Sequence, residues 1–149
     1  MTSRANEAAS FDRLRLSPDE LAAFLDEVFP ALARLNLGQL VSVAPGRVRT
    51  TLQPANLMIR PGGIVSGPTL MGLIDFAAYA VVLAHIGPVQ MAVTNTLSVT
   101  FLRSCRPEPV FADAYLLKLG RRFASIDTRV WQSAENHLVA HAIVGYALP

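Results

Sequence analysis

The sequence has little of several features that define other classes of protein. It contains one cysteine, Cys105, among 149 residues, and only 16% of its residues are charged. A single cysteine cannot form an internal disulfide, which excludes a disulfide framework and suits a reducing cytosol. The first twelve residues carry charges and no apolar run, so no secretory signal is predicted and we expect a cytoplasmic protein.

Concentrated positive charge is also missing. The net charge is +2 at pH 7, carried by twelve arginines and a single lysine, Lys118, against 11 acidic residues. The basic residues form no run, so the sequence does not predict binding to nucleic acid. A weak positive charge still suits a small phosphorylated ligand.

No uninterrupted apolar run is long enough to cross a membrane. The longest stretch, Leu70 to Ile86, contains Asp75 and is shorter than the roughly 20 residues that a span requires. Yet 52% of the residues are hydrophobic and the mean hydropathy is +0.37, which is apolar for a soluble domain. We therefore expect no membrane segment and a homo-oligomer that buries part of its surface.

The chain reads as one domain over residues 17–149, preceded by a flexible arm over residues 1–16. Residues 17–20 (Ser-Pro-Asp-Glu) have the pattern of a helix start, with a serine cap and a glutamate three residues later. They predict an amphipathic helix that continues to about Leu35. A second helix is predicted to start at residues 66–69 (Ser-Gly-Pro-Thr) and run to about Ile86.

Strands are predicted in the remaining segments. In residues 92–102, strict alternation places Val93, Leu97 and Val99 on one face and Thr94 on the opposite, polar face. The last strand is apolar on both faces and is therefore expected inside the sheet. The predicted strands are residues 40–44, 47–52, 92–102, 110–119, 123–132 and 138–148.

The order of elements is helix, hairpin, buried helix and four strands. An antiparallel sheet of five or six strands needs one face covered, and a helix that is apolar on nearly every side can cover it. We therefore predict an α+β fold in which an antiparallel five- or six-stranded sheet wraps around a long central helix.

Asp75 is the residue that this fold explains least. It is the only acidic residue between Glu27 and Glu108, and it lies in the middle of the most apolar helix. Burying an unpaired carboxylate costs several kcal/mol. Either neighbouring donors satisfy Asp75 structurally, or it is a base or nucleophile.

The start of the second helix offers a further functional hint. The free N–H groups of a helix N-terminus suit a carbonyl oxygen that gains negative charge. The structural interpretation of Ser66 and Pro68 is an ordinary serine cap followed by a proline in the first turn.

Several segments resemble the hotdog thioesterases of the phenylacetate-pathway (PaaI-like) group. Relatives carry His-Gly-Gly at the helix start and a catalytic aspartate nine residues after the histidine, which places Ser66 at the histidine position and Asp75 at the aspartate. Residues 97–103 (Leu-Ser-Val-Thr-Phe-Leu-Arg) resemble the family's strand ending in Phe-Leu-Arg, and residues 119–122 (Leu-Gly-Arg-Arg) resemble its next hairpin. The resemblance extends from about Asn56 to the end.

This resemblance implies an acyl-CoA thioesterase that needs no cofactor, since CoA is part of the substrate. It also implies a homodimer, often a homotetramer, with its active site at the dimer interface. Asp75 matches the catalytic acid, which attacks the thioester or activates water. Gly67 matches the glycine whose N–H polarises the carbonyl, and Thr94 matches a Ser/Thr position that orients the water.

Three positions depart from the pattern of the family. Ser66 replaces the histidine, and Pro68 replaces a glycine and removes one backbone donor. Arg60 stands where many relatives have an asparagine near the leaving thiol. These changes leave the aspartate in place and leave the role of Arg60 open.

Four arginines are candidate ligands for the phosphates of CoA, because a guanidinium binds phosphate through two hydrogen bonds. The alternative is that they form a solvated hairpin and strand end. They are Arg103, Arg106, Arg121 and Arg122.

Other reactive residue types lack partners in the sequence. His85, His137 and His141 are interpreted as structural or surface residues, and Cys105 has no partner histidine in a recognisable pattern. No spacing typical of metal ligands occurs.

Two other functions are compatible with the fold. A hotdog hydratase normally pairs an aspartate with a histidine, and no histidine lies near Asp75 in the loop or helix start. A non-catalytic acyl-CoA binding module would gain nothing from an acid beside an apolar acyl chain.

Overall fold

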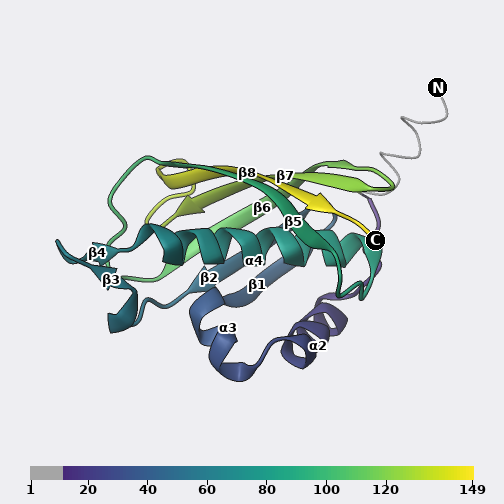
Figure 1. The fold of residues 1–149 in the computed structure, drawn as a ribbon, viewed down its shortest axis with the longest axis horizontal. Helices are drawn as coiled ribbons and strands as arrows, with labels where there is room; N and C mark the ends of the chain where they lie inside the picture. Colours follow the sequence, from purple (N-terminus) through teal and green to yellow (C-terminus); the bar gives the residue numbers. More distant parts are fainter. Residues whose placement is uncertain (1–11) are drawn as a thin grey trace.

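The computed structural model describes residues 12–149 and shows a sheet wrapped around one long helix (Figure 1). The strands are β1 (Gln39–Ala44), β2 (Arg47–Leu52), β5 (Val93–Phe101), β6 (Val110–Leu119), β7 (Phe123–Trp131) and β8 (Leu138–Ala147). They form one antiparallel sheet in the order β1-β2-β6-β7-β8-β5. This confirms the predicted α+β hotdog architecture, including the interior position of the last strand.

The central helix, α4 (Gly67–Ile86), has the boundaries that its local signals predict. The Ser66 side chain caps it by accepting a hydrogen bond from the Thr69 N–H, and Gly87 ends it with φ +98°, a value that favours glycine. Thirteen of its twenty residues are buried. Within residues 12–149 it is the one helix long and apolar enough to cross a membrane, but 72% of its most apolar stretch is buried inside the fold.

The first predicted helix is in fact two helices, α2 (Pro18–Val28) and α3 (Ala31–Leu37). The capping box at Ser17 forms as expected, with reciprocal hydrogen bonds to Glu20. Pro30 breaks the helix, because the residue before a proline is disfavoured in the helical conformation and Phe29 is accordingly extended. The prediction of one continuous helix to Leu35 was therefore wrong at this point.

The predicted N-terminal arm lies only partly within the described residues, since residues 1–11 fall outside them. Residues 15 and 16 are docked on α4: the Arg15 and Leu16 N–H groups both donate to the Ala84 carbonyl, at 2.7 and 3.2 Å. The Leu16 side chain is buried in the core. The folded domain thus includes this end of the predicted arm.

Strand β5 contains an irregularity that strict alternation did not predict. Its register against β8 shifts between Thr94 and Thr96, as in a β-bulge. The extra residue turns Thr94 to the same side as the partly buried Leu97 and Val99. The predicted placement of Thr94 on the opposite face was wrong, and the bulge is the reason.

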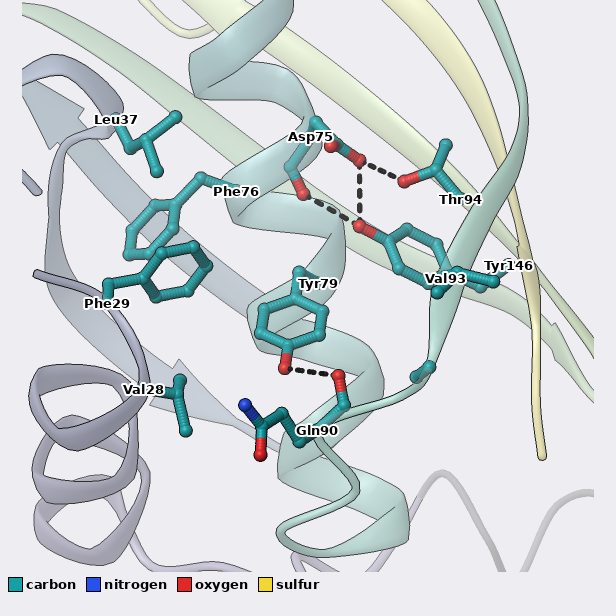
Figure 2. A pocket seen from close by; sticks show the side chains of 11 residues that line it. Val28, Phe29, Leu37, Asp75, Phe76, Tyr79, Gln90, Val93, Thr94 and Tyr146 are labelled. Carbon is teal, nitrogen blue, oxygen red and sulfur yellow. Dashed lines mark hydrogen bonds between the residues drawn. The ribbon is translucent and has the colours of Figure 1, made fainter. Parts of the chain in front are cut away.

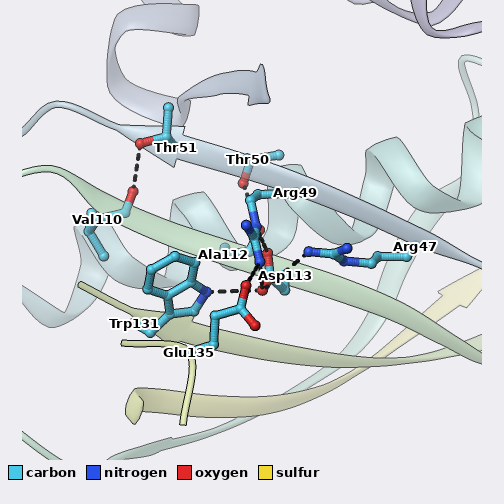
Figure 3. A network of polar contacts seen from close by, with 9 residues as sticks. All are labelled: Arg47, Arg49, Thr50, Thr51, Val110, Ala112, Asp113, Trp131 and Glu135. Atoms are coloured by element: carbon cyan, nitrogen blue, oxygen red, sulfur yellow. Dashed lines mark hydrogen bonds and ion pairs between the residues drawn. The ribbon is translucent and has the colours of Figure 1, made fainter. Parts of the chain in front are cut away.

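The outer face of the sheet carries a charged network built around Asp113 (Figure 3). Asp113 is 2% exposed, and Arg49 binds both of its carboxylate oxygens at 2.7 and 3.0 Å. Trp131 Nε1 donates to it at 3.0 Å, and Glu135 forms a further ion pair with Arg49. The hydrogen bonds that Arg49 donates to Asp113 raise the pKa of Arg49 above its usual value.

Between β2 and α4, residues 53–65 contain three short elements. They are the 3-10 turn η1 (Asn56–Met58) and a small hairpin of β3 (Ile59–Arg60) and β4 (Ile64–Val65). The Ser66 N–H donates to the Met58 carbonyl at 2.8 Å, which anchors this segment beside the start of α4.

Candidate active site

Asp75 lies on the wall of a cavity of about 350 Å³ (Figure 2). Its α4 neighbours Phe76 and Tyr79, one turn apart, line the same cavity, and the opposite wall comes from the end of α2 and the start of β5. The volume is within the range of small-molecule sites, which are mostly apolar with a few polar groups. Asp75 is half-buried, so the expectation of a fully buried acid is corrected to one that faces an opening.

Two hydroxyl groups bind the Asp75 carboxylate on the same oxygen. Thr94 Oγ1 donates to Oδ1 at 2.5 Å, and the Tyr146 hydroxyl donates to Oδ1 at 2.7 Å (Figure 2). Among residues 12–149, none donates to Oδ2 and none forms an ion pair with Asp75. The carboxylate is therefore held through one oxygen, and the other is available for chemistry.

Tyr146 is a site residue that the sequence did not reveal. It is 2% exposed, and its hydroxyl also lies 3.1 Å from the Asp75 carbonyl oxygen. Burial, followed by the negative charge of Asp75, raises the pKa of Tyr146 far above its usual value, so it remains a donor across the physiological range. A buried tyrosine usually finds a hydrogen-bond partner. The sequence does not reveal which one, because it does not show that β8 places Tyr146 beside α4.

The other predicted residues of the helix start lie away from Asp75. Gly67 precedes it by eight residues, which corresponds to about 12 Å along α4. Arg60 is exposed on β3, where its Nε donates to the Pro61 carbonyl, and Ser66 serves as the helix cap. Within one chain the structure therefore joins Asp75 to Thr94 but not to Gly67, Ser66 or Arg60.

Gly67 is instead close to the far end of β5. A Cβ atom at Gly67 would lie 3.3 Å from the ring of Phe101, so glycine allows strand and helix start to approach closely. Phe101 and Val93 on β5, and Leu102 just after it, are half exposed. Among residues 12–149, β5 is an edge strand of the sheet.

The four candidate phosphate ligands divide between the two ends of the sheet. Arg121 and Arg122 are exposed in the β6–β7 turn, at the end that holds Tyr146: the Leu148 N–H donates to the Arg122 carbonyl. Arg103 lies at the other end, where its Nη1 donates to the Leu138 carbonyl at 2.6 Å. Arg106 binds Ser133 at that same end. One chain therefore contains no single cluster of these arginines.

The histidines and the cysteine have structural surroundings. His85 Nε2 accepts a hydrogen bond from the Gly46 N–H, and its Nδ1 lies 2.7 Å from the Val81 carbonyl, so α4 is tied to the β1–β2 turn. Burial lowers the pKa of His85 and raises the pKa of the Cys105 thiol to about 11, which makes the thiol a poor nucleophile.

His141 pairs with Asp127 at 2.8 Å, and His137 is exposed. Within the described range 12–149, no group of three or more His, Cys, Asp and Glu residues is placed to hold a metal ion.

Comparisons with known proteins agree with this architecture. Residues 62–138 match the family model of the thioesterase superfamily. A candidate thioesterase from Silicibacter sp. TM1040 is 35% identical, with a TM-score of 0.81 and a match that covers 93% of this chain and 96% of that one. The chain therefore belongs to the thioesterase superfamily, whose general reaction is thioester hydrolysis.

More distant solved structures share the fold. A candidate thioesterase related to phenylacetic acid degradation, from Ralstonia eutropha JMP134, is 21% identical, with a TM-score of 0.75 over 85% of this chain and 96% of that one. A thioesterase from Haemophilus influenzae is 15% identical, with a TM-score of 0.77 over 93% and 94%. Among curated proteins, no significant match is found. The resemblance to hotdog thioesterases is thus confirmed at the level of family and fold.

Proposed function

We propose that the protein is an acyl-CoA thioesterase in which Asp75 is the catalytic carboxylate. The observation that carries the proposal is the geometry of this residue: a half-buried acid on a cavity wall, held through Oδ1 by Thr94 and Tyr146, with no donor to Oδ2 among residues 12–149. The two neutral hydroxyl donors fix the side chain without placing a counter-charge beside it. Such a carboxylate is suited to act as a base or a nucleophile.

In the proposed reaction, Asp75 Oδ2 either attacks the thioester carbonyl carbon or removes a proton from a water that attacks it. On direct attack, the C–S bond breaks to release the CoA thiolate and leave a mixed anhydride with Asp75. Water then hydrolyses the anhydride to the free acid and the Asp75 carboxylate, and the proton that this hydrolysis releases goes to the thiolate. With water, the new C–O bond gives a tetrahedral intermediate, the C–S bond then breaks, and the proton returns to the CoA sulfur. Thr94 and Tyr146 are positioning residues for the carboxylate, and a backbone N–H at Gly67 stabilises the oxygen that gains charge.

The distance between Gly67 and Asp75 within one chain supports a site shared between two subunits. The free edge of β5 exposes Val93 and Phe101, and its antiparallel pairing with a second copy would extend the sheet. In such a pair the Phe101 end of one strand faces the Thr94 end of the other. Because Gly67 lies against Phe101, this pairing brings the partner subunit's Gly67 toward Asp75.

Mixed dimers test the shared site. Asp75→Ala and Gly67→Pro, which removes the backbone donor, are each expected to be inactive. A mixed dimer has one site with both defects and one with neither, and random mixing makes about half of the dimers mixed, so co-refolding should restore about a quarter of wild-type activity. Both single variants must elute as dimers. A mixture as inactive as its parents would place the whole site within one subunit.

A panel of acyl-CoA thioesters, with the released thiol detected by colour, tests the reaction itself. The thioesterase proposal requires thiol release. A hydratase would change an enoyl-CoA without thiol release, and no histidine lines the described cavity to serve it. A binding module would give neither signal.

A further inference from the structure

A second cavity of about 390 Å³ lies beside the first half of α4. Its walls come from the end of α3, from the η1 turn and from the first turns of α4. The side chains that matter here are those of Leu37, Leu57, Met58, Pro68 and Thr69, together with Gly72. Nothing in the reaction proposed above uses this cavity.

The two cavities are adjacent along one face of α4. Pro68 and Gly72 line the second cavity, and Asp75 and Tyr79 line the first. These four residues are spaced by three or four, which places them in a row on the same helix face, over about 16 Å along the axis. The cavities therefore follow one another along the same face of α4.

Leu37 marks the boundary between the two cavities, because it lines both. A Cβ atom at Gly72 would lie 3.5 Å from Leu37 Cδ2. Leu37 thus lies over the one position of this helix face that has no side chain. A larger residue at Gly72 would fill the space between the two cavities, and a smaller residue at Leu37 would enlarge it.

The chemistry of the two cavities indicates what they hold. In the cavity beside Asp75, the ring of Phe29 packs edge to face against two other rings. Its centroid lies 5.9 Å from that of Phe76 and 5.8 Å from that of Tyr79. The second cavity is lined by aliphatic side chains and two neutral polar residues, Asn36 and Thr69, and by no charged one. A phosphate would have no cation there, whereas a flexible hydrocarbon chain would bury its surface.

We infer that the two cavities form one acyl groove, and that the enzyme acts on straight-chain aliphatic acyl groups long enough to pass Leu37 and enter the second cavity. Gly72 and Leu37 then determine acyl length. This inference rests on the proposed thioesterase function, because it needs the reacting carbonyl beside Asp75. The nucleotide of CoA lies outside the groove.

The first test compares kcat/KM over a series of saturated acyl-CoAs from four to sixteen carbons. Gly72→Leu should keep activity on the short substrates within about threefold of wild type and lose at least about tenfold on the long ones, since each methylene that enters an apolar site is worth up to about fourfold in binding. Leu37→Ala should move the optimum to longer chains. Met71→Leu and Leu35→Ala, which change neighbours that line neither cavity, should leave the length profile unchanged.

A second test does not require turnover. Here free fatty acids of the same lengths displace a bound fluorescent fatty acid, and their affinities are compared. Affinity should rise with chain length in the wild type, and this rise should be absent in Gly72→Leu. Parallel length profiles for wild type and Gly72→Leu in both tests would overturn the groove. The groove would also be overturned if the kcat/KM of the wild type did not increase with acyl length beyond the shortest substrates. Absence of thiol release from every thioester, together with length-dependent fatty acid binding, would instead overturn the thioesterase function and retain the groove.

Discussion

Asp75 and Asp113 lie on opposite faces of the same sheet and have opposite surroundings. Asp113 is nearly inaccessible and is bound by Arg49 through both oxygens, with Trp131 as a third donor (Figure 3). Asp75 is half-buried and has two hydroxyl donors on one oxygen (Figure 2). Arg49 occupies both oxygens of Asp113 and makes it part of a structural ion pair. Asp75 is held through one oxygen, and its second oxygen has no donor among residues 12–149.

The same substitution at both acids provides the sharpest test of this contrast. Asp75→Asn preserves the shape and removes the charge, and we expect turnover to fall by at least about 10²-fold, the low end of general-base contributions. The fold should persist, and stability should hold or rise because a half-buried charge without a cation beside it is removed. Turnover within threefold of wild type, measured with the best acyl-CoA, would contradict the role of Asp75.

Asp113→Asn is expected to have the reverse effect. It leaves the Arg49 guanidinium without its counter-ion, and breaking a buried pair costs about 3–5 kcal/mol. Arg49 is 19% exposed and keeps its ion pair with Glu135. We therefore expect the free energy of unfolding to fall by about 2 kcal/mol, measured by urea unfolding at fixed protein concentration. Activity per folded molecule should stay within about twofold. A loss of turnover as large as that of Asp75→Asn would remove the distinction between the two acids.

The sequence distinguishes only one of these acids. Asp75 is conspicuous because it interrupts the most apolar helix, and a helix apolar on all sides is predicted to be buried. Asp113 follows the ordinary alternation of a strand, between Phe111 and Tyr115, and looks like a solvated outer residue. Its burial comes from Arg49 on β2 and Trp131 on β7, and no local pattern encodes which strands become neighbours.

In the fold and in the site, the features that local sequence encodes could be predicted, and those that depend on which elements pack together could not. Helix α4 and the strand segments follow from caps, turn residues and hydrophobic periodicity, which are local. Thr94 was identified through the family resemblance, but alternation assigned it to the wrong face because it does not reveal the β-bulge. Pro30 indicates a break in the first helix, and the prediction of one continuous helix did not take it into account. Tyr146 could not be found, since its role depends on the packing of β8 against α4.

Tyr146→Phe sharpens the contrast by removing one hydroxyl donor from Asp75. A hydrogen bond to a charged group contributes about 1.5–3 kcal/mol, so we expect about a tenfold loss in kcat with little change in KM. Tyr79→Phe is the matched control: it removes a hydroxyl in the same cavity that binds the Gln90 carbonyl instead. If both variants lose the same fraction of kcat, Tyr146 is only a packing residue.

The smallest effects are expected at arginines that bind neither acid. Arg121 and Arg122 are exposed in the β6–β7 turn, and within residues 12–149 no acidic partner lies within ion-pair distance of them. If they bind the phosphates of CoA, the double change to alanine should raise KM about three- to tenfold and leave kcat nearly unchanged. Phosphate binding far from the reacting carbonyl is equal in the ground and transition states. The effect should disappear with a truncated pantetheine thioester, which has no nucleotide. Equal losses on both substrates would show that these two arginines support the hairpin rather than the ligand.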